Sequence, residues 1–351
     1  MRSELTTGSR RGFLKTCLAG AIALATAEES CAFEAGSVGQ GAKSKVSIAR
    51  DPLLRGLSIH GPGSKESSNA GSMDSKRILN LLDAAIRGLF DDDNPVGSWS
   101  RLVRPGQAIG IKVNTLGGRG LSSNALLVEA ICERLQGAGI KARDIVIWDR
   151  DTQEMERAGF RIRQGGTEVQ CFGTDRVGFE EHFSEFGSVG SQLSKILSQR
   201  CDVLINVPVL KDHDGAGVSI ALKNMFGAIH NPNKYHPDGC NPYVADVNML
   251  PEIRSRLRLH ICDATSACFD GGPAFKPEFT WQPNALIVAQ DPVALDQVGW
   301  QMIERKRSER GLKTLAAEGR APRYIETAAD AEHRLGTNDS RRIVVVEKTL
   351  A

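Results

Sequence analysis

The sequence contains eight cysteines, but no two of them are spaced as C-x-x-C. Zinc ribbons and ferredoxin-type iron–sulfur sites need closely spaced thiolates that converge on one metal centre, so this spacing excludes both kinds of site. Cys132, Cys201 and Cys262 lie in or beside apolar runs and are expected to be buried in the core. For Cys262 the alternative is a disulfide with Cys268.

A basic surplus and a membrane-spanning run are also missing. The formal charge of +2 becomes −1, from 40 basic and 41 acidic residues, when residues 1–27 with their four basic residues and one Glu are removed. A near-neutral chain without a basic stripe is not expected to bind nucleic acid. No segment after residue 27 approaches the roughly 20 apolar residues that a transmembrane helix needs, so no stable membrane span is expected there.

The N-terminus does carry a specific signal. Ser9-Arg10-Arg11-Gly12-Phe13-Leu14-Lys15 precedes an uncharged apolar run from Cys17 to Ala27, which is the pattern of a twin-arginine export signal. The pattern predicts that the twin-arginine export machinery recognises the chain and moves it, already folded, to the periplasm or out of the cell.

The run of eleven residues is too short to span a bilayer, and Ala25-Thr26-Ala27 has the small residues that a signal peptidase recognises. We therefore expect a signal peptide over residues 1–27, a flexible Gly- and Ser-rich leader over residues 28–45, and one domain over residues 46–351. The alternative is that the N-terminal segment is retained as an anchor.

Val- and Ile-rich runs alternate with helical segments along the rest of the chain. This alternation predicts an α/β fold with a mostly parallel, mixed-edge sheet and helices on both faces. The expected helices include residues 74–90, 123–137 and 291–310. The expected strands are residues 46–49, 108–113, 144–148, 168–172, 202–207, 257–262, 285–289 and 342–347.

Ligands of such sheets gather at the carboxyl ends of the strands, so polar residues there are candidates for a site. Lys112 and Asn114 stand at the end of one expected strand, and Arg119 follows in a glycine-rich loop. Backbone N–H groups of this loop, together with the two cations, would suit a bound anion. The alternative is a tight turn between strand and helix.

A second strand end leads into Lys211, Asp212 and His213. Alternate residues of an extended chain share a face, so Lys211 and His213 are expected to project together and Asp212 to point the other way. A cation beside an imidazole suits binding of an anion and movement of a proton. Asp214 is expected to cap a following helix over residues 217–227, and catalysis or metal ligation is the alternative for it.

That helix carries Lys223 and Asn224 and leads to His230 and His236. The chain also places Asp263 at the end of another strand and Asp296 inside an apolar helical segment that Asp291 caps. Imidazole and carboxylate side chains could together bind a divalent metal. The candidate ligands are Asp212, His230, Asp263 and Asp296, and surface hydrogen bonding is the alternative for the loop histidines.

These segments together resemble the domain-of-unknown-function family 362 (DUF362) over residues 46–350. Lys112-Val113-Asn114 corresponds to the early Lys-Pro-Asn-like segment of that family. The other matching segments, in order, are Asn206-Val-Pro-Val-Leu-Lys211-Asp-His213, Leu222-Lys-Asn-Met-Phe-Gly227, Tyr235-His236, Asp263-Ala264, Gly272-Pro273 and Asp291-Pro-Val-Ala-Leu-Asp296.

The resemblance implies little about activity, because the family is named for its missing function. Many members carry an iron–sulfur ferredoxin module, which this chain lacks, and an electron-transfer role is therefore in doubt. Val209 and Asp212 replace the Lys and Thr of the usual Pro-Lys-Leu-Lys-Thr-His run, whereas Lys211 and His213 are kept.

Two functions follow from these residues. In the first, the chain is a periplasmic enzyme that acts on a small anionic molecule, with Lys211, His213 and His236 as catalytic groups. Lys112, Asn114, Arg119, Lys223 and Asn224 would bind the ligand, with a divalent metal as a possible cofactor. In the second, the same cleft binds a small ligand or a metal for delivery or assembly, without turnover.

The export signal gives a direct prediction. Replacing both Arg10 and Arg11 by Lys is expected to abolish export, because the ammonium of Lys does not reproduce the planar donor pattern of a guanidinium group. Cell fractionation and immunoblotting should find the double variant in the cytoplasm and the unaltered protein outside it. Equal export of both proteins would contradict a twin-arginine signal.

Overall fold

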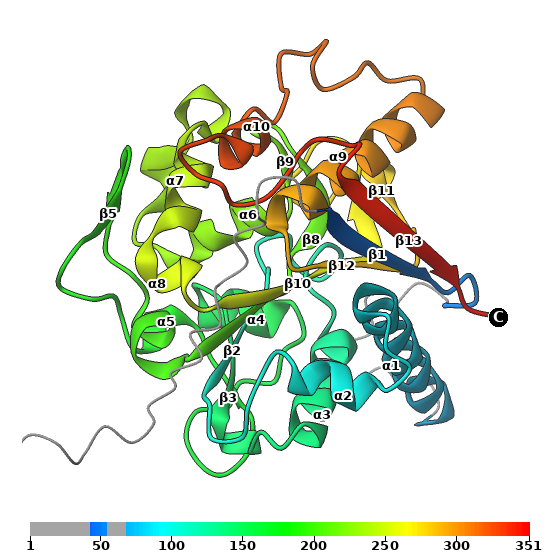
Figure 1. The fold of residues 1–351 in the computed structure, drawn as a ribbon, viewed down its shortest axis with the longest axis vertical. Coiled ribbons are helices and arrows are strands. Elements are labelled where there is room, and N and C mark those ends of the chain that lie inside the picture. The colour runs from blue at the N-terminus through cyan, green and yellow to red at the C-terminus, as the bar shows by residue number, and fades with distance from the viewer. Residues whose placement is uncertain (1–42, 55–67) are drawn as a thin grey trace, which may run out of the picture. The chain divides into compact units, whose positions relative to one another are not determined.

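A computed structural model of the chain describes residues 43–54 and 68–351 (Figure 1). The twin-arginine motif, its apolar run and Cys31 lie outside the described residues. Of the leader expected over residues 28–45, only the last three residues are described, and Ser44 and Lys45 already belong to the first strand. None of the helices in these two ranges has the length and apolar character that a bilayer crossing requires.

The described residues form a central sheet of eleven strands. The main path through it runs β13-β1-β12-β10-β7-β2-β3-β4, while β11 and β8 pair with β10 and β9 pairs with β8. A separate hairpin joins β5 (Ser184–Phe186) to β6 (Val189–Ser191). The strands of the central sheet are β1 (Ser44–Arg50), β2 (Ile109–Lys112), β3 (Ile145–Trp148), β4 (Gln170–Cys171), β7 (Val203–Asn206), β8 (Val209–His213), β9 (Gly217–Ser219), β10 (Leu257–Cys268), β11 (Thr280–Trp281), β12 (Ala285–Ala289) and β13 (Ile343–Thr349).

Most neighbouring strands of the main path are parallel, which confirms the fold class expected from the sequence. The run β10-β7-β2-β3-β4 is parallel throughout, and β1 is parallel to β13. Strand β12 is antiparallel to both β1 and β10, so the antiparallel pairing lies inside the sheet. A strand is present in each of the eight segments where the sequence predicts one.

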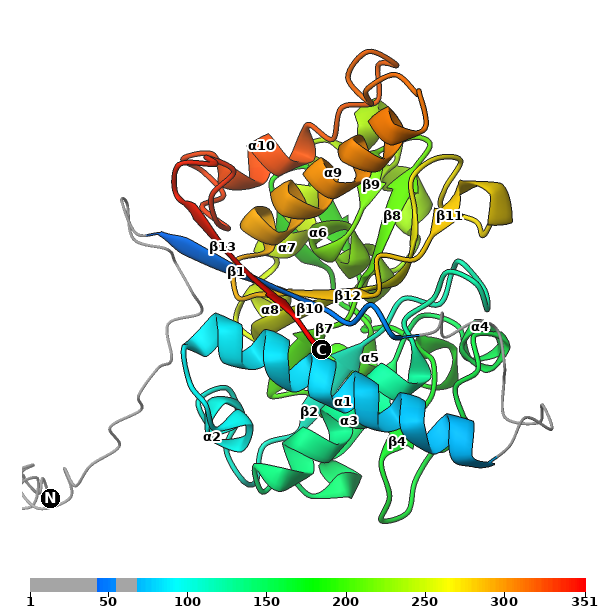
Figure 2. The same cartoon turned by 90° about the vertical axis from the view of Figure 1, so that its right-hand side faces the viewer.

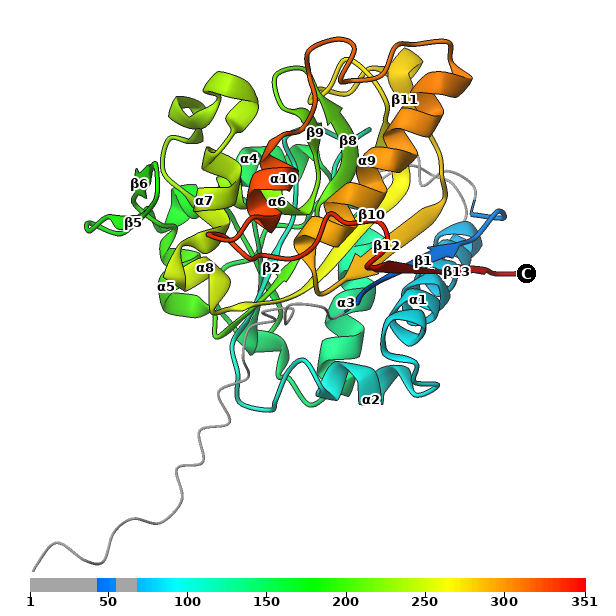
Figure 3. The same cartoon turned by 45° about the horizontal axis from the view of Figure 1, so that its top comes forward.

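Helices cover both faces of the sheet (Figure 2). Helices α1, α2 and α3 lie on one face, and α6, α7, α9 and α10 lie on the other, where α9 runs along β12 (Figure 3). The helices are α1 (Ser68–Phe90), α2 (Pro95–Ser100), α3 (Ala125–Gly137), α4 (Thr152–Arg157), α5 (Lys195–Arg200), α6 (Ala221–Asn224), α7 (Tyr243–Met249), α8 (Pro251–Arg254), α9 (Pro292–Glu309) and α10 (Tyr324–Ala329).

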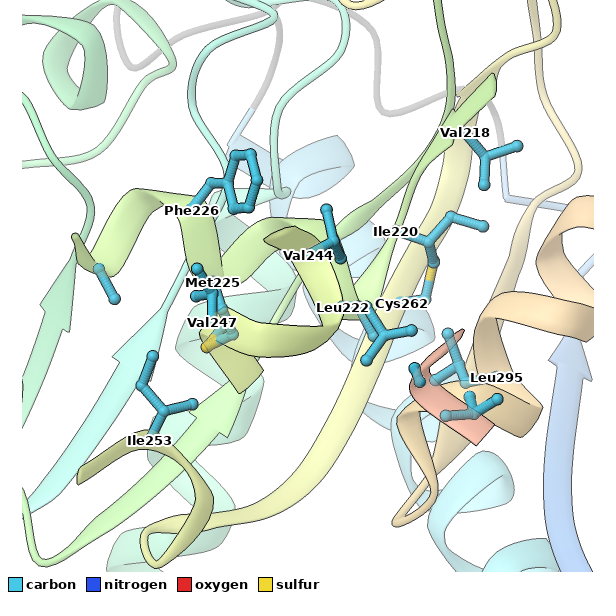
Figure 4. Close-up of a cluster of buried hydrophobic side chains, with 14 of the residues drawn as sticks. Val218, Ile220, Leu222, Met225, Phe226, Val244, Val247, Ile253, Cys262 and Leu295 are labelled. Atoms are coloured by element: carbon cyan, nitrogen blue, oxygen red, sulfur yellow. The ribbon is translucent and has the colours of Figure 1, made fainter. Parts of the chain in front are cut away.

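Two large apolar clusters fill the spaces between the sheet and these helices. Strands β2, β3, β7 and β12 are buried along their whole length, as expected for strands with helices on both sides. Figure 4 shows part of one cluster, in which Leu222 of α6 lies among Val247 of α7, Leu295 of α9 and Cys262 of β10. This packing holds the short helix α6 against the sheet.

The helix predicted over residues 217–227 is wrong in its first part. Gly217–Ser219 forms β9 and pairs antiparallel with β8, and the helical conformation starts only at Ala221. Asp214 therefore caps no helix, and its Oδ1 accepts a hydrogen bond from Gly215 N in the turn between β8 and β9. Pairing with a neighbouring strand has overridden a local helical pattern.

The cap of α6 comes from a distant residue instead. Asp296 of α9 is fully buried, and its two carboxylate oxygens accept hydrogen bonds from Ala221 N at 2.7 Å and Leu222 N at 3.2 Å. The predicted cap of α9 is confirmed, because Asp291 Oδ1 accepts from Val293 N and Ala294 N. Asp296 thus ties α6 to α9.

Six cysteines lie in the described residues, and all six are free and buried, including Cys132, Cys201 and Cys262 as predicted. The alternative that Cys262 forms a disulfide with Cys268 is wrong. Both residues lie on β10, where six residues of extended chain separate their Cα atoms by roughly 20 Å. A disulfide requires Cα atoms within about 7 Å of each other.

The cap of α6 predicts a stability effect. Asp296→Ala is expected to lower the free energy of unfolding by about 2 kcal/mol or more, because two buried N–H groups lose their acceptor. Urea unfolding measures this, with Asp93→Ala at an exposed position as the control. Equal stability of the two variants would show that Asp296 does not support α6.

Candidate functional site

The carboxyl ends of the parallel strands bring the candidate residues together. Lys112 ends β2, Asn206 ends β7, and Lys211 and His213 lie in β8, which follows β7 after two residues. Helix α6 carries Lys223 and Asn224, and Asn224 forms hydrogen bonds with Lys112 and Asn206 at these strand ends. Segments more than 100 residues apart in the chain therefore meet in one polar cluster.

Lys112 is held by a buried ion pair. Its Nζ lies 2.8 Å from Oδ1 of Asp149, the first residue after β3, and Asp149 Oδ2 accepts from both the N–H and the hydroxyl of Thr115. Burial opposes a charge on Asp149, but the Lys112 ammonium and the Thr115 donors hold its pKa below the ordinary value. Gly227 makes this approach possible, since a Cβ there would lie 2.6 Å from Lys112 Nζ.

A chain of amide side chains continues from this pair. Lys211 Nζ donates to Asn114 Oδ1 at 2.6 Å, Asn114 Nδ2 donates to Asn224 Oδ1 at 2.9 Å, and Asn224 Nδ2 donates to Asn206 Oδ1 at 2.7 Å. The chain ends at His260, whose Nδ1 lies 3.0 Å from Asn206 Nδ2. Burial lowers the pKa of His260 to about 3, so its neutral ring accepts this bond. The orientation of every amide in the chain is thereby fixed.

Two further lysines are buried without a carboxylate. Lys211 is 1% exposed and Lys223 is 7% exposed, and neither forms an ion pair with any Asp or Glu of the described residues. Lys223 Nζ lies 3.3 Å from His236 Nε2 and 4.7 Å from the centre of the Phe226 ring. Burial, together with the nearby Lys223 charge, lowers the pKa of Lys211 to about 8, and burial also lowers the pKa of Lys223.

The two histidines of the cluster are stacked, with ring centres 5.7 Å apart. His213 Nδ1 accepts from the N–H groups of Gly215 and Ala216, so the neutral ring carries its hydrogen on Nε2. Burial, with the charge of Lys223, lowers the pKa of His213 to about 2. Its approach to Asp214, 3.2 Å, is therefore not an ion pair at neutral pH. His236 Nδ1 faces the carbonyl oxygen of Pro232 at 3.1 Å, which leaves its Nε2 to accept from Lys223.

Asp212 lies on the opposite face of β8, as the alternation of the strand predicts. It is fully buried, with Oδ1 2.8 Å from Arg320 Nη1 and Oδ2 accepting from Gly272 N. Burial, opposed by Arg320, raises the pKa of Asp212 to about 6. Arg307 of α9 also approaches Asp212, at 4.0 Å. Asp212 thus holds β8 in place from behind the cluster.

The structure does not bring the proposed metal ligands together. Asp212 is engaged by Arg320, His230 is exposed beside Phe179, and Asp296 caps α6. Asp263 accepts from Thr265 and from Asn124 N. Within residues 43–54 and 68–351, no three His, Cys, Asp or Glu side chains are grouped so that they could hold a metal ion.

Arg119 is exposed in its loop and has no hydrogen bond to the cluster within the described part of the chain. Conversely, Asp149, Thr115 and His260 belong to the cluster but were not among the residues predicted from the sequence. The rule that selected Lys112 would also have found Asp149, because it directly follows a strand that is parallel to β2. His260 lies in the middle of β10 and has no comparable signal.

Comparisons with known proteins give a family and distant structural similarity. A sequence model of the family described as "Domain of unknown function (DUF362)" matches residues 109–301, which is more than half of the chain. No curated protein matches the chain.

Two solved structures are similar to this one at a low level. The lactate racemase apoprotein from Thermoanaerobacterium thermosaccharolyticum aligns with a TM-score of 0.39 and 13% identity, over 62% of this chain and 54% of that one. A protein from Thermotoga maritima aligns with a TM-score of 0.38 and 8% identity, over 67% of this chain and 59% of that one. The chain thus spans little more than half the length of either structure.

Burial of Lys211 predicts a pH-dependent stability. Its pKa in the folded protein, about 8, lies below the ordinary 10.5, so the folded state binds fewer protons than the unfolded state between these values. The protein should therefore gain about 2–3 kcal/mol in free energy of unfolding from this residue between pH 7 and pH 10.

Lys211→Met lacks this titrating amine. Between pH 7 and pH 10 its free energy of unfolding should therefore fall by about 2–3 kcal/mol relative to that of the unaltered protein. Urea unfolding at the two pH values measures it, with Lys141→Met at an exposed position as the control. Parallel pH profiles for the unaltered protein and Lys211→Met would contradict the buried, unpaired amine.

Proposed function

This chain belongs to the domain-of-unknown-function family 362, and we propose that it is an exported enzyme that binds a small anionic substrate and exchanges a proton with it. The substrate would lie at the carboxyl ends of β2, β7 and β8. Lys223 would bind its negative charge, Lys211 would exchange the proton, and His213 would donate a hydrogen bond.

The observation that carries this proposal is the burial of Lys211 and Lys223 without a carboxylate. Removing an ammonium ion from water costs several kcal/mol unless an opposite charge replaces the lost hydration. Lys112 has such a partner in Asp149, whereas the other two lysines have only uncharged acceptors. A bound anion would supply the missing negative charge.

The pKa values indicate which role each titratable group can take. A proton-transfer group works best with a pKa near the working pH, and Lys211, at about 8, meets this condition. His213, with a pKa of about 2, stays neutral and can only offer its Nε2–H as a hydrogen-bond donor. His236 accepts from Lys223 and keeps that ammonium turned toward the histidine pair.

Export through the twin-arginine pathway to the periplasm is part of the proposal and rests on Arg10, Arg11 and the apolar run that follows them. A metal plays no part in it, because Asp212, Asp263 and Asp296 already accept hydrogen bonds from other groups and lie apart from one another. Metal analysis of the purified exported protein by mass spectrometry tests this choice. A stoichiometric metal that is lost in His213→Ala or His236→Ala would require a different mechanism.

The alternative is a binding or assembly protein without turnover. It is favoured by the saturated hydrogen bonds of the amide chain and of Asp149, which make the cluster rigid. His213→Ala separates the two functions once a ligand is known. Loss of turnover with binding retained indicates an enzyme, whereas loss of binding in a protein that shows no turnover indicates the alternative.

Anion binding is the first property to measure. Inorganic phosphate, sulfate, succinate and pyruvate should be titrated into the protein and followed by calorimetry at pH 7. At least one is expected to bind, and Lys223→Met should weaken it by about ten- to a hundredfold, because a hydrogen bond to a charged group contributes roughly 1.5–3 kcal/mol.

Lys234→Met is the matched control. Lys234 lies in the loop that carries His236, but it is exposed and its Nζ donates to Gly190 O. Its replacement should leave anion affinity unchanged. Equal weakening by both variants would show that the anion is attracted by the general charge of the loop and not by Lys223.

A further inference from the structure

We propose that Lys211 is a nucleophile that forms an imine with the carbonyl carbon of a small oxo acid. This inference rests on the proposed function and narrows it, since it names the substrate class as an anion that carries both a carboxylate and a ketone or aldehyde group. It also gives each of the three buried lysines a separate part.

The acceptors of the three lysines differ. Lys112 faces the carboxylate of Asp149, which favours the protonated, unreactive amine and opposes the burial that lowers its pKa. Lys223 lies over the ring of Phe226, and the face of an aromatic ring favours a cation. Lys211 has the amide oxygen of Asn114 as its hydrogen-bond acceptor, and a neutral amine can donate to that oxygen as well as an ammonium ion can.

The surroundings also favour the neutral amine of Lys211. Burial and the charges of Lys223 and Lys112 lower its pKa, and the charge of Asp149 opposes them in part, so that the pKa lies at about 8. A lysine desolvated beside another cation is a recognised nucleophile for carbonyl compounds. At pH 7 roughly a tenth of such a lysine is neutral, against less than about a thousandth of an exposed lysine.

The neighbouring groups match the other parts of an oxo acid. His213 lies two residues after Lys211 on the same face of β8, and its Nε2–H can donate to the carbonyl oxygen. Lys223 can bind the carboxylate. Asn114 is only half-buried, and a ligand would reach the amine by displacing the hydrogen bond between Asn114 and Lys211.

The chemistry needs no other reactant. The lone pair of the Lys211 amine attacks the carbonyl carbon, the C=O π electrons move to the oxygen, and a proton passes from the nitrogen to that oxygen. The resulting carbinolamine loses its hydroxyl group and the remaining nitrogen proton as one water molecule, which leaves a C=N bond. The step is reversible, and nothing is oxidised or reduced.

Reductive trapping tests this proposal. The exported protein would be incubated at pH 7 with pyruvate, 2-oxoglutarate or acetoacetate and sodium cyanoborohydride, which reduces an imine to a stable secondary amine. Peptide mapping by mass spectrometry should find the adduct on Lys211, formed about a hundredfold faster than on an exposed lysine, from their neutral fractions. Lys223→Met should trap at least severalfold less, and succinate, which has no carbonyl, should compete.

Lys211→Arg keeps a cation at this position but removes the nucleophile, so its site should form no adduct. Circular dichroism checks that this variant is folded. Competition by succinate in the unaltered protein tests, without any variant, whether the adduct forms at the anion site. Adducts spread evenly over exposed lysines with all three oxo acids would overturn the proposal.

A second measurement distinguishes a failure of imine formation at Lys211 from a failure of the proposed function. Acetic anhydride acetylates accessible amines, and the extent of reaction at Lys211 and Lys223 can be compared with and without pyruvate or succinate. Protection of both lysines without any trapped adduct would overturn imine formation but keep the anion site. Neither protection nor adduct would overturn both.

Discussion

The site depends on one electrostatic constraint, which is that only one of its three buried lysines forms an ion pair with a carboxylate within the described residues. The ion pair between Lys112 and Asp149 satisfies one of them and at the same time joins the ends of β2 and β3. Lys211 and Lys223 are left to uncharged acceptors, and this imbalance shifts their pKa values and calls for an anion. Without the Asp149 pair, the excess of positive charge at these strand ends would be larger by one.

Two carboxylates outside the cluster hold its parts in position. Asp212 is bound by Arg320 on the far face of β8 and so fixes the strand that presents Lys211 and His213. Asp296 of α9 caps α6, the short helix that presents Lys223 and Asn224. Both carboxylates come from the segments that first suggested metal ligation, and both instead orient backbone elements.

Local pattern and the rule for parallel sheets predicted much of this arrangement. The apolar runs gave the strands, and their carboxyl ends placed Lys112 near Lys211. The alternation along β8 separated Asp212 from its neighbours. What failed was non-local. Strand β9 replaced the start of a predicted helix because it pairs with β8, and Arg320, the ion-pair partner of Asp212, lies 108 residues further along the chain. No spacing within one segment carries that information.

The amide chain from Lys211 to His260 has a consequence for the movement of protons. Asn114, Asn224 and Asn206 are linked in one direction by donors and acceptors, but a primary amide does not ionise near neutral pH. The chain therefore transmits orientation and not protons, so that the buried His260 is insulated from the reactive end. Any proton that reaches or leaves Lys211 therefore has to travel by a route other than this chain of amides.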